Sequence, residues 1–228
     1  QVTQRFDSVT PDMEDPKELK KFLELIRSLS AKGAILAYHD RSDGGLAAAL
    51  CEMMFASHVG VEIVADALVS KDRTLNQALF NEELGAVIQV ARGRAAEVER
   101  DFEAAGMGWS LKYLGNLTQD DHLNIYLEGK CVLSEDRVDL QKAWNEVSWQ
   151  IARMRDNPEC VDSEYELISD KHNGGLVLTM GFDPEENLAA PFINTGVRPK
   201  VAILREQGVN SQNEMASAFL QAGFDAVD

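Results

Sequence analysis

The chain of 228 residues is long enough for one large domain, or for one domain and part of another. Its 38 acidic and 22 basic residues give a formal charge of −16, which disfavours nucleic acid and anionic membranes as partners because it repels their phosphates. No apolar run reaches the roughly 18 residues that a membrane span needs, and the three cysteines have neither disulfide nor zinc-site spacing. These features predict a cytoplasmic protein with a hydrophobic core.

The first predicted elements alternate between helix and strand. Apolar residues at three- and four-residue steps predict a helix that begins near Pro16 and ends at Gly33, and the short apolar run AILAYHD predicts a buried strand over 34–40. A second helix follows Gly44-Gly45. The pattern then predicts a strand at 59–66, a short helix at 73–83, a strand at 85–92 and a helix at 94–105.

Three strands and a long helix complete the first predicted domain. The strands are SLKYLGNLT, HLNIYLEG and KCVLSED, and a turn at 128–130 joins the last two. The helix after them carries an apolar stripe, which predicts that this face packs on the core: Leu140, Trp144, Val147 and Ile151. Strands and helices in alternation predict a layered α/β (α+β) domain over 1–157.

The remainder of the chain predicts a linker and the start of a second domain. Prolines, glycines and acids interrupt every apolar stretch over 158–198, where one strand is expected at 176–180. From 199 to 228 the pattern predicts a strand, a helix that begins with a Ser211–Glu214 capping box, and a second strand. Because the first methionine is Met13 and the sequence stops inside this βαβ unit, we expect a piece of a longer polypeptide.

The stretch HDRSDGG lies where the predicted strand 34–40 leads into a helix, which is where open α/β folds place ligands. In one interpretation, Asp40 holds Mg²⁺ while Ser42 and the amides of Gly44-Gly45 contact phosphates. In the other, Asp40 or Asp43 only caps the helix and the glycines make the turn. The local pattern leaves both interpretations open.

Two motifs in this order, HDRSDGGLAAALCEMMFAS and LFNEELGAVIQV, resemble the C-terminal lobe of the aminoimidazole ribonucleotide synthetase-like superfamily. With the linker and PKVAILREQGVNSQNEMASAFLQAGFDAVD, the chain resembles the phosphoribosylformylglycinamidine synthase family of the large, single-chain bacterial type. In that family two synthetase-like halves precede a class I glutamine amidotransferase domain. The resemblance implies that this chain is the C-terminal lobe of the second half, the linker and the first βαβ element of the amidotransferase domain.

The resemblance also implies a reaction. The family converts formylglycinamide ribonucleotide, glutamine, ATP and water to formylglycinamidine ribonucleotide, glutamate, ADP and phosphate. Carried over to this chain, it assigns Asp40 as a Mg²⁺ ligand and Ser42 as an ATP/ADP contact, and it implies that the remaining metal ligands lie in a preceding lobe. The nucleotide at this second-half site is expected to be a structural ADP, and no catalytic residue is expected within the segment.

Several other polar residues have two interpretations each. His39 fits a buried or interface residue better than a general base, because neighbouring strand residues face opposite ways. Asn81 and Glu82 either touch substrate or cap a turn, and Gly208 and Asn210 either shape a glutamine pocket or make a turn. Two other function classes remain open: a nucleotide-binding regulatory module, and another ATP-dependent phosphotransferase of the same superfamily.

Overall fold

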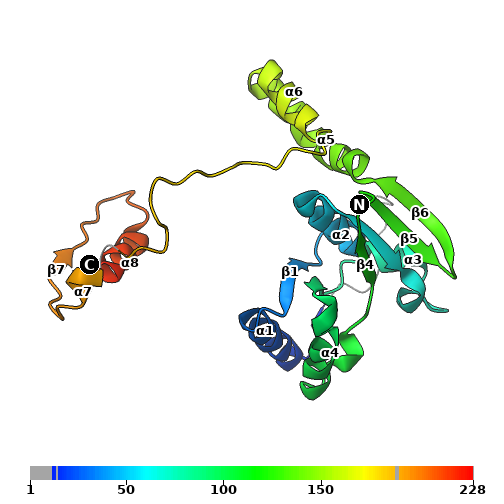
Figure 1. Cartoon of the computed structure of the whole chain (residues 1–228), viewed down its shortest axis with the longest axis horizontal. Helices are drawn as coiled ribbons and strands as arrows, with labels where there is room; N and C mark the ends of the chain where they lie inside the picture. Colours follow the sequence, from blue (N-terminus) through cyan, green and yellow to red (C-terminus); the bar gives the residue numbers. More distant parts are fainter. Residues whose placement is uncertain (1–11, 14, 188–189, 228) are drawn as a thin grey trace. The chain divides into compact units, whose positions relative to one another are not determined.

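Two units divide the chain, Gln1–Asn173 and Gly174–Asp228. The computed structural model describes residues 12–13, 15–187 and 190–227, and Figure 1 draws their helices and strands and labels most of them. The first unit has a mixed four-stranded sheet and a separate two-stranded sheet, and the second unit has a parallel pair of strands. This arrangement confirms the α/β class. No helix in the described ranges is both long and apolar enough to cross a membrane.

The larger sheet of the first unit has the strand order β4-β2-β5-β6. The strand β2 (Gly60–Val64) runs parallel to β5 (His122–Leu127) and antiparallel to β4 (Gly115–Thr118), while β5 pairs antiparallel with β6 (Lys130–Asp136). Helix α2 (Gly45–Ser57) and helix α3 (Leu75–Phe80) contribute to the same core as β2 and β5. Buried members of this core include Leu50, Met54, Ile63, Leu79 and Ile125.

The smaller sheet pairs β1 (Ile35–Asp40) with β3 (Ala86–Val90) in antiparallel register. Helix α1 (Pro16–Ala31) and helix α4 (Ala95–Ala104) form a second core beside it, with Leu25, Leu29, Val98 and Phe102 buried. The sequence predicted α1 well because Asp15 caps its first turn and Pro16 occupies its first position. The described part of this unit also contains short 3₁₀ helices: η1 (Ala65–Leu68), η2 (Arg92–Arg94) and η3 (Gly108–Ser110).

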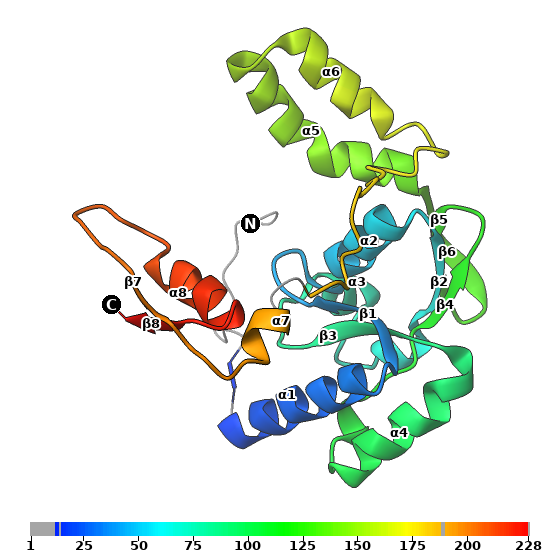
Figure 2. The same cartoon turned by 60° about the vertical axis from the view of Figure 1, so that its left-hand side comes forward.

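Helix α5 (Arg137–Arg155) packs through a different face from the one that the sequence predicted. Trp149 stacks on Tyr165 of α6 (Pro158–Leu167), with ring centroids 4.3 Å apart, and the two helices lie side by side in Figures 1 and 2. The predicted core stripe is largely exposed: Trp144 is 58 % exposed and Val147 69 %. Leu140 borders the core and Trp144 touches the buried Phe55, but Val147 and Ile151 are exposed, so the expectation that the whole stripe packs on the core is wrong.

One buried ion pair fixes the start of α5 to the sheet. The side chain of Arg137 is fully buried and donates two hydrogen bonds to the carboxylate of Asp121, and a third to Gln141. Burial of an arginine is stable only when its donors find acceptors, which these contacts provide. Lys171 pairs with the same Asp121 and with Asp136, so the end of the first unit is held at this point.

The second unit contains α7 (Ala190–Ile193), β7 (Lys200–Ala202), α8 (Gln212–Gln221) and β8 (Asp225–Val227), and β7 and β8 pair in parallel as predicted. Three details differ from what the sequence predicted. The segment 176–180 forms no strand, and α6 lies inside the range that was expected to be linker. Ser211 makes no capping bond because its backbone is left-handed, with φ 73°.

Candidate functional site

Asp40 is the last residue of β1, and its carboxylate is exposed where the strand gives way to the turn before α2. Residues two apart on a strand share a face, so Tyr38 lies beside Asp40, and its hydroxyl donates to Asp40 Oδ1 at 2.5 Å. Burial, followed by the hydrogen bond and the charge of Asp40, raises the pKa of Tyr38 to about 12. The phenol is therefore protonated, and acts as a donor, at any physiological pH.

The second motif of the sequence, FNEELG, lies directly against the first. Gly44 N–H donates to Glu82 Oε1 at 3.2 Å, and Arg41 donates to the backbone oxygens of Glu83 and Leu84. The backbone N–H of Arg41 also donates to Gly85 O at 2.9 Å. Burial, and then the charge of Arg73, lowers the pKa of Arg41, but a guanidinium stays charged in proteins. Arg41 and Glu82 thus join the two motifs into one structure.

Gly45 allows the close approach between the motifs. Its φ of +67° is unfavourable for other residues, and a Cβ there would lie 2.5 Å from Asn81 O and 2.8 Å from Leu79 O. No side chain fits at those distances. The two glycine amides are already bonded within the protein, because Gly45 N–H donates to Ser42 O and Gly44 N–H to Glu82. The expectation that these two amides contact phosphates is therefore not supported.

Capping does not explain the acidic residues of HDRSDGG. Helix α2 has Gly44 at its N-cap and no capping bond from a side chain of that residue. Within the described residues, Asp43 makes no side-chain hydrogen bond, and the hydrogen bonds of Asp40 join it to its strand neighbours instead. The cap interpretation for Asp40 and Asp43 is wrong, and the contact to Gly44 comes instead from Glu82, which the sequence left with two interpretations.

The chemistry at Asp40 fits a hard divalent cation. Its carboxylate is exposed, Oδ1 is held by Tyr38, and Oδ2 receives no hydrogen bond from the described part of the chain. Carboxylate oxygen is the donor that Mg²⁺ prefers. No group of three or more His, Cys, Asp or Glu side chains that could hold a metal occurs among the described residues, so Asp40 would be a single ligand. The hydroxyl of Ser42, also exposed, is likewise without a hydrogen bond in this part of the chain.

His39 lies on the opposite face of β1 from Asp40, as the strand geometry predicted. Its Nε2 lies 2.7 Å from Glu52 Oε2, and its Nδ1 lies 2.5 Å from Asp40 O. Glu52 also accepts a hydrogen bond from Trp144 Nε1 at 3.2 Å. Both ring nitrogens of His39 lie within hydrogen-bond distance of protein oxygens, which fits a residue that links elements better than a general base. His39 instead connects β1 with α2 and α5.

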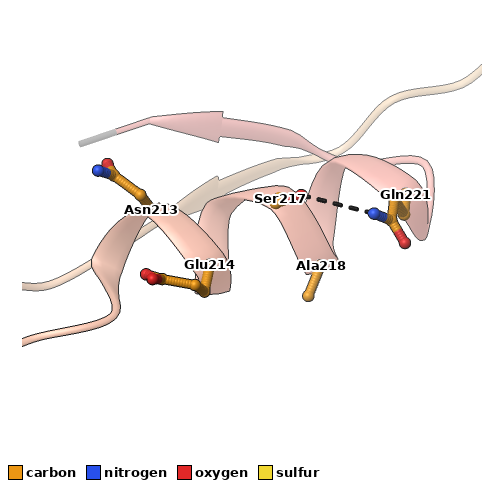
Figure 3. A pocket seen from close by; sticks show the side chains of 5 residues that line it. All are labelled: Asn213, Glu214, Ser217, Ala218 and Gln221. Atoms are coloured by element: carbon orange, nitrogen blue, oxygen red, sulfur yellow. Dashed lines mark hydrogen bonds between the residues drawn. The ribbon is translucent and has the colours of Figure 1, made fainter. Parts of the chain in front are cut away.

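In the second unit, a hollow lies along one face of α8. Five side chains from one face of α8 line it, as Figure 3 shows: Asn213, Glu214, Ser217, Ala218 and Gln221. A single hydrogen bond at 3.5 Å, from Gln221 to Ser217, is drawn between them. Gly208 and Asn210 are not part of the hollow, and Asn210 Oδ1 accepts from Ser211 N–H at 2.8 Å. For Asn210 this contact favours the turn interpretation.

Comparison with known proteins explains the order of these elements. Residues 2–128 match the model of the AIR synthase related protein, C-terminal domain, which is more than half of the 228 residues. The chain belongs to the AIR synthase related family. Residues 198–228 match the model of the CobB/CobQ-like glutamine amidotransferase domain. The AIR synthase related domain is thus followed, in the same chain, by the start of an amidotransferase domain.

Solved structures with the AIR synthase related fold include PurL of Thermotoga maritima. The chain is similar to that PurL complexed with FGAR (TM-score 0.50, 17 % identity, 59 % of this chain and 23 % of that chain). It is also similar to PurLQS from Thermotoga maritima (TM-score 0.50, 14 % identity, 96 % of this chain and 29 % of that chain). The chain spans less than a third of the length of these structures, and at such identities the likeness concerns the fold.

Tyr38 and Arg41 belong to this site and were not singled out from the sequence. For Tyr38 the signal was present, because Tyr38 and Asp40 are two residues apart in a predicted strand and must share a face. The contact between Glu82 and Gly44 carried no such signal. The two residues are far apart in the sequence, and the pairing of β1 with β3 and the close approach of Gly45 to the 79–81 backbone bring them together.

Proposed function

We propose that the chain is a segment of a cytoplasmic phosphoribosylformylglycinamidine synthase, the glutamine-dependent, ATP-hydrolysing ligase of purine synthesis. The observation that carries the proposal is the order of the two family matches, at 2–128 and 198–228, on one chain. A fold hosts many functions, but a superfamily phosphotransferase has no use for an amidotransferase domain that supplies ammonia. In this proposal 1–157 form the synthetase-like lobe, 158–198 the connection and 199–228 the start of the amidotransferase domain.

Within this enzyme, Asp40 is proposed as a ligand of Mg²⁺ and Ser42 as a contact of the bound nucleotide. Mg²⁺ bridges carboxylate and phosphate oxygens and offsets the charge of the phosphates. The exposed carboxylate of Asp40 and the exposed hydroxyl of Ser42 are consistent with these roles. Arg41 and Glu82 hold the turn between β1 and α2 in place through the 82–85 loop.

The segment supplies one side of a site that other lobes complete. Asp40 alone gives too few ligands for a stable Mg²⁺ site, so the remaining ligands are proposed to come from a preceding lobe of the same enzyme. Formylglycinamide ribonucleotide and glutamine are proposed to bind elsewhere in the complete protein. We propose that the nucleotide at Asp40 is ADP that stabilises the enzyme and is not turned over.

The Asp40→Asn variant of the complete natural enzyme tests this role. It removes one charge from the metal ligand with little change of shape, so bound ADP should be lost during purification. The melting temperature should fall too, because a ligand bound only to the folded state contributes about 2.7 kcal/mol at a hundredfold excess over its Kd. Nucleotide content is measured by chromatography of the denatured protein, and melting by calorimetry.

Asp43→Asn is the matched control, since it makes the same change three residues away on an exposed side chain that makes no hydrogen bond within the described part of the chain. It should retain ADP and melt as the wild type does. Equal nucleotide content in the two variants, with equal melting temperatures, would contradict the assignment of Asp40.

A further inference from the structure

The hydroxyl of Tyr38 makes its hydrogen bond to a carboxylate on its own strand. The residue is 39 % exposed, its cross-strand neighbour on β3 is Ile88, and its hydroxyl is turned along the strand to Asp40 Oδ1. Packing of a tyrosine ring on a sheet needs no hydroxyl contact to a carboxylate. The hydroxyl therefore has a role that a phenylalanine at this position would not fill.

A carboxylate that ligates a cation needs a second contact to fix its orientation. Metal-binding carboxylates in proteins are themselves hydrogen-bonded, and loss of such an outer contact costs about 10–100-fold in metal affinity. Apart from Tyr38, no described residue donates to the Asp40 carboxylate. Its Oδ1 is thus held by Tyr38 while Oδ2 has no donor among the described residues, which is the arrangement that one-oxygen ligation requires.

We propose that Tyr38 is a positioning residue for metal binding: its hydroxyl holds Oδ1 of Asp40 and so presents Oδ2 to the divalent cation. This inference rests on the proposed function, because it takes Asp40 as a ligand. Tyr38 itself does not touch the cation. The hydrogen bond restricts the Asp40 side chain before the cation binds, so the side chain loses less conformational entropy on binding.

The test uses Mn²⁺ as the probe and the complete natural enzyme, loaded with ADP and freed of Mg²⁺. Electron paramagnetic resonance measures the affinity for Mn²⁺. Tyr38→Phe removes only the hydroxyl and should weaken Mn²⁺ binding about tenfold. Tyr113→Phe makes the same chemical change at an exposed tyrosine on another segment and should leave the Mn²⁺ affinity unchanged. The melting curve of metal-free Tyr38→Phe should show the variant fully folded at the temperature of the binding measurement, with only the small decrease that one lost hydrogen bond causes.

A double-variant comparison separates this inference from the proposed function. Asp40→Asn should abolish the Mn²⁺ site, and adding Tyr38→Phe to it should have no further effect, because the hydroxyl acts through the carboxylate. If Asp40→Asn loses Mn²⁺ while Tyr38→Phe binds it like the wild type, the role of Tyr38 is wrong and the proposed site stands. If Asp40→Asn keeps Mn²⁺, both are wrong. If metal-free Tyr38→Phe is unfolded at the temperature of the binding measurement, the positioning role is overturned, since the weaker binding would then come from general destabilisation.

Discussion

Trp144 and Trp149 lie five residues apart on α5 and have different surroundings. Trp149 stacks on Tyr165, donates to Asp162 at 2.9 Å and lies under the guanidinium of Arg153. Trp144 contacts Phe55 with ring centroids 5.8 Å apart, but more than half of its surface is exposed. Of these two residues, Trp149 makes the more extensive contacts. It lies on the face of α5 opposite the apolar stripe that the sequence predicted to be buried.

We expect Trp149→Ala to destabilise the α5–α6 pair by about 2–3 kcal/mol, below the range for fully buried aromatic residues because Trp149 is half-buried. Trp144→Ala should cost about 1 kcal/mol. Hydrogen exchange of the amides of 158–167 measures the local opening free energy in each variant. Trp109→Ala, at an exposed tryptophan, is the control. A larger effect of Trp144→Ala than of Trp149→Ala on these amides would show that the stripe is the stabilising face.

At the scale of elements, the junction of α2 with the 79–82 segment depends on a residue without a side chain. Gly45→Ala combines an unfavourable φ with a Cβ placed 2.5 Å from Asn81 O, so we expect a loss of about 2–4 kcal/mol. Gly129→Ala has a similar φ of +73° with nothing within 4 Å of the new Cβ, and should cost about 1 kcal/mol. Thermal unfolding of the two variants compares these costs, and equal values would mean that the close approach contributes nothing.

The first turn of α5 depends on the charge of Asp136, which accepts from Val138 N–H and from Lys171. Burial raises the pKa of Asp136, but the hydrogen bonds from Lys171 and Val138 outweigh it, and the net shift is downward. A lowered folded-state pKa stabilises the fold above the unfolded value of about 3.9, and this contribution is lost as the pH falls through the folded value. Protection of the first α5 amides from hydrogen exchange should therefore decrease below about pH 4. In Asp136→Asn the protection should be low already at neutral pH and should lack this acid-dependent step.

The sequence predicted most helices and strands, but it did not always predict which face of an element is buried. The change from a strand pattern to a helix pattern at HDRSDGG located β1, the turn and α2, because that change is local. A local pattern can show that the stripe on α5 is apolar, but it cannot show whether another part of the protein packs on it. Asn157-Pro158 is a good helix start, and Asn157 does cap α6, yet the polar sequence after it hid the helix. The assignments of Asp40 and Ser42 remain predictions.

At the scale of the whole chain, the cysteines bear on the amidotransferase reaction. Burial, with the charge of Glu52, raises the pKa of Cys51 to about 11, so its thiol stays protonated at neutral pH. Cys131 and Cys160 are exposed, and none of the histidine contacts in the described ranges involves a cysteine. A glutaminase of the thiol type needs a thiolate with a base beside it.

We therefore expect this chain by itself to release no glutamate from glutamine, as measured by a coupled glutamate assay. Release that disappears when one of the three cysteines is changed to serine would contradict this expectation. Release that survives all three changes would indicate a contaminating enzyme and would be removed by further purification.

The parallel pairing of β2 with β5 affects how the chain folds during its synthesis. β5 supplies Leu123 and Ile125 to the core that contains Ile63 of β2, yet a ribosome makes it about 60 residues later, which takes roughly 3–12 s at typical elongation rates. During that interval the β2 segment and the apolar face of α2 lack their partner strand. The nascent chain is then most open to chaperones, and a pause in translation before residue 123 would prolong that exposure.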